Sequence, residues 1–247
     1  MKKNILLTVA YDGTDYFGFQ RQNEPNLPTV QGALEKGLST FFKQDIVSDL
    51  ASRTDKGVHA LGQRVLVKVD TTVPVENLPM ALPSFLPDDI VIRVAEEVED
   101  DFHPRYNCVK KEYCYKIYDD RYKNPLYRNV SEFSRNKLDI LKMQEGAKYL
   151  VGTHDFKSFQ ATGSNAKTTV RTIFDIDVKK DGDFILITVV GSGFLYNMVR
   201  IIAGTLIEVG EGKIFPEDVE KIMKSCDRTK AGKTAMAGGL TLVKIDY

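Results

Sequence analysis

The sequence predicts an α+β protein with a largely antiparallel sheet, and three observations support this class. Several short segments, such as RVLVKVD at 64–70, alternate apolar and polar residues as half-buried strands do. Two longer segments, 29–42 and 194–210, carry apolar residues at helical spacing. Strands and helices do not alternate regularly along the chain, which argues against parallel βαβ units.

The first half of the chain is predicted to contain a strand, a helix and two further strands. ILLTVAY at 5–11 is a β-branched, apolar strand, and a helix is expected to begin after a Thr29 cap. The apolar face of that helix comprises Val30, Leu34, Leu38 and Phe41. The strand at 64–70 directs Val65, Val67 and Val69 to one side, and IVIRVAEEV at 90–98 adds another strand.

The second half repeats a mixed pattern of strands and helices. EYCYKIY at 112–118 is predicted to be a strand with Tyr113, Tyr115 and Ile117 on one face. The remaining predicted elements are a helix at 137–152 that ends at Gly152, a hairpin of strands 172–180 and 184–191 around DGD, a helix at 194–210, and a strand at 240–247.

Composition describes a soluble protein that needs neither disulfides nor a metal ion to fold. The chain has 247 residues, of which 43% are hydrophobic, and a formal net charge of zero. The three cysteines lack C-x-x-C spacing, and the three histidines lack ligand spacing, so no metal site is expected. Charged residues interrupt the apolar N-terminus too early for a signal peptide or a spanning helix, so a cytoplasmic protein without membrane attachment is expected.

Charge is distributed unevenly along the chain. Basic residues predominate between 105 and 142, and acidic residues predominate between 88 and 101. Two interpretations remain open, because these segments can form two solvated faces or contribute to a local basic groove for a polyanion.

The stretch ASRTDKGVHA at 51–60 raises the question of what Asp55 does. An Asp two residues before a Gly is typical of a tight turn, in which the carboxylate accepts backbone hydrogen bonds. A carboxylate that arginine keeps ionised can also act as a nucleophile or a base. The two roles are compatible, because reactive groups are commonly displayed on loops that a rigid sheet supports.

Arg200 is the second unusual residue, because it lies in an otherwise apolar helix. Its predicted face also carries Gly193, Asn197 and Gly204, which are small or polar, so another backbone or a ligand can approach the guanidinium. One interpretation is a stem that covers apolar surface and a head that reaches water. The other is a buried ion pair, for which Asp55 is the candidate partner, and such a pair would lower the pKa of Asp55.

Nine segments, in order along the chain, resemble the TruA family of tRNA pseudouridine synthases. They are AYDGTDYFGFQRQ, TVQGALE, SRTDKGVHALGQ, LPDDIVIR, DFHPRYNCVKKEYCYKI, GTHDFKSF, TVRTI, GFLYNMVRIIAGTL and GLTLVKIDY. The resemblance implies that Asp55 is the nucleophile, that Arg53 draws the target base from the RNA stack, that Tyr113 packs on this base and that Arg200 pairs with Asp55.

The resemblance also implies a substrate and a fold. The substrate is tRNA at uridines 38, 39 and 40 of the anticodon stem-loop, and the reaction needs no cofactor and no metal. The implied enzyme is a cytoplasmic homodimer built of two ferredoxin-like (RRM-like) halves, 1–104 and 105–247, whose sheets join beside a central catalytic cleft. Residues beside the matched segments that could contact phosphates are Arg21, Lys110, Lys111, Lys157, Lys167 and Arg171.

Three departures from the family pattern bear on substrate preference more than on the catalytic groups. Phe19 stands where the family commonly has Trp, Ser52 stands where Gly usually precedes RTD, and AMAGGL at 235–240 replaces an APA-type segment. A Ser at position 52 would disturb the backbone beside Asp55 if the position required a positive φ.

Two other functions compete with the isomerase. A non-catalytic RNA-binding module with a ferredoxin-like fold would stack bases without chemistry and would tolerate the loss of Asp55. A hydrolase with Ser52, His59 and Asp55 as a triad is disfavoured, because three members within eight residues rarely converge in space.

Overall fold

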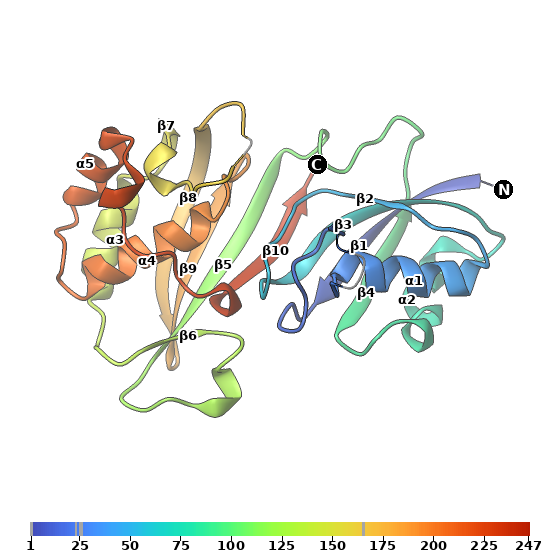
Figure 1. The fold of residues 1–247 in the computed structure, drawn as a ribbon, viewed down its shortest axis with the longest axis horizontal. Helices are drawn as coiled ribbons and strands as arrows, with labels where there is room; N and C mark the ends of the chain where they lie inside the picture. The colour runs from blue at the N-terminus through green and yellow to red at the C-terminus, as the bar shows by residue number, and fades with distance from the viewer. Residues whose placement is uncertain (1, 23, 25–26, 165) are drawn as a thin grey trace. The chain divides into compact units, whose positions relative to one another are not determined.

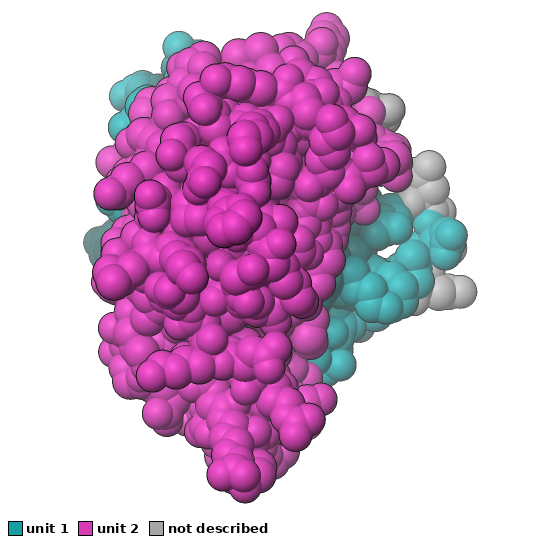
Figure 2. Space-filling view, turned by 90° about the vertical axis from the view of Figure 1, so that its left-hand side faces the viewer, with its two compact units in different colours: residues 1–109, 242–247 teal, residues 110–241 magenta. Residues whose placement is uncertain are grey.

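The chain forms two compact units in a computed structural model that describes residues 2–22, 24, 27–164 and 166–247. The first unit comprises residues 1–109 and 242–247, and the second comprises residues 110–241 (Figure 2). The sequence-based division at 104/105 lies close to the first break. The difference is the C-terminal strand, which groups with the first unit because it pairs with a strand there.

The first unit is built on an antiparallel sheet (Figure 1). Its strands are β1 (Lys2–Tyr11), β2 (Ser48–Leu50), β3 (His59–Asp70), β4 (Ile90–Glu97) and the unit's part of β10 (Leu240–Asp246). The order is β4-β1-β3-β10, and β2 also pairs with β3. The predicted strands at 5–11, 64–70 and 90–98 are confirmed, whereas β2 is a strand that the sequence pattern missed.

Helix α1 (Val30–Phe42) supplies the helical part of this unit's core. The predicted cap is confirmed, because the Thr29 hydroxyl oxygen accepts a hydrogen bond from the Gly32 amide at 3.2 Å. Val30, Leu34 and Leu38 are completely buried, as the helical spacing predicts, whereas Phe41, the fourth residue of the predicted face, is only half-buried. A short helix α2 (Leu78–Ala81) lies between the 3₁₀ turns Val75–Asn77 and Pro83–Phe85.

The second unit is also built on mainly antiparallel strands. Its strands are β5 (Lys110–Asp119), β6 (Glu132–Ser134), β7 (Gly152–Asp155), β8 (Val170–Asp181) and β9 (Phe184–Gly191). The order is β5-β9-β8-β7, and β6 runs parallel to the end of β5. The predicted hairpin is confirmed, with Gly182 at a φ of 58° in its turn. The predicted face of Tyr113, Tyr115 and Ile117 is buried.

Helices α3 (Ile140–Lys148) and α4 (Met198–Gly210) contact each other and strands β8 and β5, respectively. Both are shorter than predicted. Asp139 caps α3 by accepting from the Lys142 amide, and the helix ends at Lys148 rather than near Gly152, which begins β7 at a φ of 114°. Helix α4 begins at Met198, because Asn197 has a left-handed backbone.

The remaining regular elements were not predicted from the sequence. They are α5 (Asp218–Ser225) and the 3₁₀ turns Pro125–Tyr127, Lys157–Phe159, Arg228–Lys230 and Ala237–Gly239. The three cysteines are free thiols of intermediate burial. Within the described residues, no helix is both long enough and apolar enough to span a bilayer.

Residues 232–239, called the 232–239 segment below, pack closely on α4. A Cβ atom built on Gly204 would lie only 1.9 Å from the Lys233 carbonyl oxygen, so only glycine fits at this point of the helix. The small and polar residues on this face predict that another backbone or a ligand can approach it, and the 232–239 segment is such a backbone. Gly232 adds a hydrogen bond from its amide to the Thr205 hydroxyl at 3.0 Å.

A buried carboxylate holds the same segment from the other side. Glu132, in β6, is 6% exposed and accepts hydrogen bonds from the Lys233 ammonium at 2.6 Å and the Met236 amide at 3.0 Å. The Tyr115 hydroxyl donates to the same carboxylate at 2.5 Å. Both carboxylate oxygens are therefore satisfied, as a buried charge requires.

Substitution of Gly204 tests this close approach. In Gly204→Ala the new methyl group meets the Lys233 carbonyl, so we expect the free energy of unfolding to fall by about 1–3 kcal/mol. Gly146→Ala in α3 is the matched control, because its Cβ would meet only side-chain atoms, the nearest at 3.3 Å. Urea unfolding of both variants measures the difference, and an equal effect at the two positions would contradict the interpretation.

Glu132 should also give the stability a defined pH dependence. Burial alone would raise its pKa above the ordinary 4.5, but hydrogen bonds from Lys233, Tyr115 and the Met236 amide lower the pKa overall. A carboxyl whose pKa is lower in the folded state stabilises the fold fully above its unfolded-state pKa, and this contribution is lost as the pH falls through the folded-state pKa.

We therefore compare the native chain with Glu132→Gln by urea unfolding across the acid range. The difference in unfolding free energy should be constant above about pH 5.5 and should shrink as the pH falls below about 4.5. A difference that stays unchanged down to about pH 3 would show that the Glu132 pKa is not lowered by folding.

Candidate active site

The loop at 51–58, between β2 and β3, is held by hydrogen bonds on both sides of Asp55. The Phe19 amide donates to the Thr54 carbonyl at 3.2 Å, and the Gly57 amide donates to the Tyr16 carbonyl at 3.3 Å. Inside the loop, the Val58 amide donates to the Asp55 carbonyl at 3.1 Å, which closes a turn. The turn predicted from D-x-G is thus present, and Gly57 has the positive φ of 76° that such turns favour.

Buried groups beneath the loop fix its backbone. The hydroxyls of Tyr11 and Thr54 lie 2.7 Å apart in a buried hydrogen bond. A Cβ built on Gly18 would lie 2.6 Å from the Thr54 carbonyl oxygen, so the GF turn at 18–19 approaches the loop backbone directly. Phe19, one of the three departures noted in the sequence, is completely buried and packs on Tyr11 with ring centroids 5.7 Å apart.

The side chains of Arg53 and Asp55 extend from this fixed backbone. Arg53 is exposed and Asp55 is half-buried, whereas Ser52 and Thr54, which alternate with them, are buried. Ser52 does not have the positive φ that would strain it, and the Gln63 side chain binds both its amide and its carbonyl. The substitution at position 52 therefore fits the loop without backbone strain.

His59 closes the loop at the start of β3. Its Nδ1 lies 3.0 Å from an Asp12 carboxylate oxygen and 3.1 Å from the Gly13 amide nitrogen. The protonated ring donates to Asp12, and the neutral ring accepts from Gly13. Burial would raise the pKa of Asp12, but hydrogen bonds from Thr14 and the proximity of His59 lower the pKa overall. These contacts give His59 the structural role of tying the loop to the end of β1.

In the second unit, Tyr113 projects from β5 beside Phe194. The two rings meet edge to face at 86°, with centroids 5.2 Å apart, and Tyr113 is 6% exposed. Phe194 belongs to the GFLYN stretch that leads into α4, so the aromatic pair connects the strand with the residues just before Arg200. The unit thereby holds an aromatic pair and a cationic side chain on adjacent elements.

Arg200 lies in the first turn of α4, and polar groups from two directions hold its guanidinium. Its Nε donates to the Ala235 carbonyl at 2.8 Å, and one terminal nitrogen donates to the Asn197 side-chain oxygen at 2.6 Å. The Ala235 amide in turn donates to the Arg200 carbonyl at 3.2 Å. Asn197 adopts a φ of 58°, a conformation that asparagine tolerates better than most residues.

The four predicted site residues thus fall into two groups, one in each unit. Arg53 and Asp55 share the fixed loop of the first unit, and Tyr113 and Arg200 lie on β5 and α4 of the second. The ion pair between Asp55 and Arg200 stays a prediction. The sequence pattern did not indicate Glu132, because its hydrogen-bond partners lie at positions 115, 233 and 236, too far along the chain to form a local motif with it.

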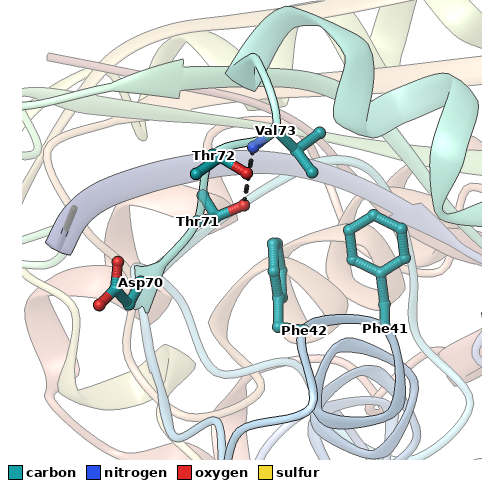
Figure 3. A pocket seen from close by; sticks show the side chains of 6 residues that line it. All are labelled: Phe41, Phe42, Asp70, Thr71, Thr72 and Val73. Atoms are coloured by element: carbon teal, nitrogen blue, oxygen red, sulfur yellow. Dashed lines mark hydrogen bonds between the residues drawn. The ribbon is translucent and has the colours of Figure 1, made fainter.

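Two surface pockets of the first unit contain none of these four residues. One, of about 400 Å³, is lined by Phe41, Phe42 and residues 70–73, and the Val73 amide donates to the Thr71 hydroxyl oxygen at 3.0 Å (Figure 3). The other, of about 360 Å³, lies beside the Arg21–Glu35 ion pair. In the described part of the chain, no three His, Cys, Asp or Glu side chains are grouped to hold a metal ion.

Comparison with known proteins assigns the chain to a family. A family model described as tRNA pseudouridine synthase matches residues 7–107 and 147–247. The protein named tRNA pseudouridine synthase A 2 of Clostridium tetani (strain Massachusetts / E88) is 47% identical over 247 residues, which cover 100% of both chains. The tRNA pseudouridine synthase A of Thermoanaerobacter sp. (strain X514) is 48% identical over 245 residues, which cover 99% of this chain and 100% of the relative.

Two substitutions of Asn197 separate its backbone role from its side-chain role. Asn197→Gly keeps the left-handed backbone and removes only the oxygen that accepts from Arg200. Asn197→Ala loses both, so we expect it to lower the free energy of unfolding by about 1–2 kcal/mol more than Asn197→Gly does. Thermal or urea unfolding measures the difference. If the alanine variant were as stable as the glycine variant, the left-handed conformation would carry no cost here.

Proposed function

Because this chain belongs to the tRNA pseudouridine synthase family, we propose that it isomerises uridines 38, 39 and 40 of the tRNA anticodon stem-loop with Asp55 as the nucleophile. It is an isomerase that acts on uridine in tRNA, as its similarity along its full length to proteins named tRNA pseudouridine synthase A indicates. The finer statements concern the residues that act and the uridines that are modified.

The observation that carries the nucleophile assignment is the contrast between the backbone and the side chain of Asp55. Hydrogen bonds from the Phe19 and Val58 amides, and the hydrogen bond between the Tyr11 and Thr54 hydroxyls, immobilise the loop backbone. The Asp55 carboxylate nevertheless remains only half-buried. A reactive group held in one position but open to substrate loses little orientational entropy in the transition state.

In the proposed reaction, the Asp55 carboxylate attacks the target nucleotide and the bond between ribose and N1 of uracil breaks. The freed base rotates and forms a new bond from C5 to the ribose. The C5 proton is then released to solvent, and N1, which carried no proton while it was bonded to ribose, takes one up from solvent, so the isomerisation consumes no external group and transfers no electrons. Asp55 departs as a carboxylate and is ready for another cycle.

The other three residues have supporting roles in this proposal. Arg53, which is exposed, enters the space that the target base leaves in the RNA stem. Tyr113 offers its ring to the extracted base, and its edge-to-face contact with Phe194 supports the ring in one orientation. Arg200 pairs with Asp55 and keeps the carboxylate ionised.

Basic side chains beside the matched segments are proposed to bind the tRNA backbone. Arg21, Lys110, Lys157 and Lys167 are exposed, which suits contact with phosphates. Lys111 and Arg171 are half-buried, and the Arg171 guanidinium donates to the carbonyls of Thr168 and Val170. On the resemblance of the matched segments, we also propose that the enzyme is a cytoplasmic homodimer that binds tRNA in a central cleft.

The fold proposed for both halves is ferredoxin-like. The first unit supports this proposal with the element order β1-α1-β2-β3-α2-β4 and the pairings β4-β1, β1-β3 and β3-β2, all of them antiparallel. The second unit supports it with β5-α3-β8-β9-α4 and the sheet order β5-β9-β8.

Tritium release from tRNA that contains [5-³H]uridine tests the proposal. Asp55→Asn keeps the size of the side chain but not its nucleophile, so we expect release to fall by more than about 10³-fold while tRNA affinity stays within about threefold. Asp49→Asn is the matched control, because Asp49 is an exposed carboxylate of the adjacent strand β2, and it should retain native release.

Replacing uridines 38, 39 and 40 by cytidine, one at a time, assigns the positions. Release that persists in Asp55→Asn would contradict the nucleophile assignment, and release that survives when all three uridines are replaced together would contradict the anticodon stem-loop. If the native protein bound tRNA and released no tritium from any tRNA pool, it would act as a non-catalytic RNA-binding module.

A further inference from the structure

Glu132 is a buried charged group that the proposed reaction does not use. It is 6% exposed, and its two oxygens accept hydrogen bonds from Tyr115, Lys233 and the Met236 amide. A buried ion pair is not in itself a strong source of stability, because desolvation of the charges offsets most of their attraction. The placement of this carboxylate is therefore better explained by the groups that it orients.

The donors to Glu132 all converge on the 232–239 segment. Lys233 and Met236 belong to this segment, and the Tyr115 hydroxyl lies 3.0 Å from the Met236 carbonyl oxygen as well as 2.5 Å from Glu132. A Cβ built on Gly239 would lie 2.6 Å from the Tyr115 ring, so the segment also packs directly on this tyrosine. Glu132 and Tyr115 thus hold both ends of the short stretch 233–236.

Ala235, which lies between Lys233 and Met236, is hydrogen-bonded to Arg200 and orients it. Ala235 accepts a hydrogen bond from Nε of Arg200 at 2.8 Å through its carbonyl and donates to the Arg200 carbonyl at 3.2 Å through its amide. The adjacent Met236 amide is bound to Glu132. The direction of the guanidinium therefore depends on a carbonyl whose neighbouring peptide is held by the buried carboxylate.

We propose that Glu132, together with the Tyr115 hydroxyl, is a positioning residue that sets the orientation of Arg200 through the Ala235 carbonyl. The inference rests on the proposed function, in which Arg200 pairs with Asp55 during the reaction. Displacing a group that acts on the reacting atoms by about 1 Å can lower the rate about 10²-fold, even when the altered residue touches no substrate.

Glu132→Gln and Tyr115→Phe perturb this arrangement in different ways. The glutamine keeps an acceptor but loses the charge that binds Lys233, and the phenylalanine loses only the hydroxyl. We expect each to lower kcat for tritium release about 10- to 100-fold, with the tRNA KM within about threefold. Ser158→Ala is the matched control, because it removes another buried hydroxyl of the second unit, which donates to the Ile222 carbonyl, and it should keep the native kcat.

A double-mutant cycle with Arg200→Lys separates positioning from a general structural effect. Lysine keeps the charge but lacks the Nε–H group that donates to Ala235, so the link to Glu132 is already lost. In this background we expect Glu132→Gln and Tyr115→Phe to cause no further fall in kcat. Equal fold-losses in both backgrounds, or native kcat for both single variants, would overturn the inference.

The same cycle distinguishes failure of the inference from failure of the proposed function. If Arg200→Lys and Arg200→Ala both retained the native kcat, the proposed role of Arg200 would fail, and the positioning role with it. If the Arg200 variants lost activity while Glu132→Gln and Tyr115→Phe did not, only the positioning role would fail. Thermal unfolding of every variant establishes that each rate is measured on folded protein.

Discussion

A guanidinium in the first turn of an apolar helix must find polar partners that the helix itself cannot supply, and much of the second unit is arranged around this requirement. Arg200 takes one partner from Asn197, which ends the preceding turn in a left-handed conformation, and another from the Ala235 carbonyl. For this carbonyl to arrive, the 232–239 segment must approach α4 more closely than any side chain would allow. Gly204 makes that approach possible.

In the first unit, the Asp55 carboxylate is accessible while the backbone of its loop is fixed. Asp55 and Arg53 alternate with buried neighbours, so Ser52 and Thr54 fix the loop while the side chains of Arg53 and Asp55 remain accessible. The backbone of the GF turn lies against the loop without an intervening side chain, because Gly18 has none. Within residues 52–55, buried residues that fix the backbone thus alternate with residues whose side chains are accessible.

The two arrangements share a physical logic. In each unit, polar groups that would be costly to bury alone are satisfied by backbone atoms of a second segment, and a glycine permits that segment to come near. In the proposed reaction, one unit supplies the nucleophile and the other supplies the aromatic ring and the cation. The backbone of the loop that carries Asp55 and the guanidinium of Arg200 are both held by hydrogen bonds before substrate arrives, which reduces the entropy lost on reaching the transition state.

The sequence by itself determined the elements whose signals are local. Strand alternation at 64–70, the Thr29 cap and the D-x-G turn at Asp55 involve residues close together in the chain, and each is present in the structure. Ordered motifs also sufficed to identify the family, because nine short segments preserve residue types and spacing.

Only the tertiary structure decided the features that join distant residues. The return of residues 242–247 to the first unit and the network around Glu132 both depend on segments far apart in the chain. Glu132 resembles any surface glutamate when it is viewed among its sequence neighbours. Its burial becomes favourable only when Tyr115, Lys233 and Met236 bring donors to it, and their convergence is set by chain topology rather than by local pattern.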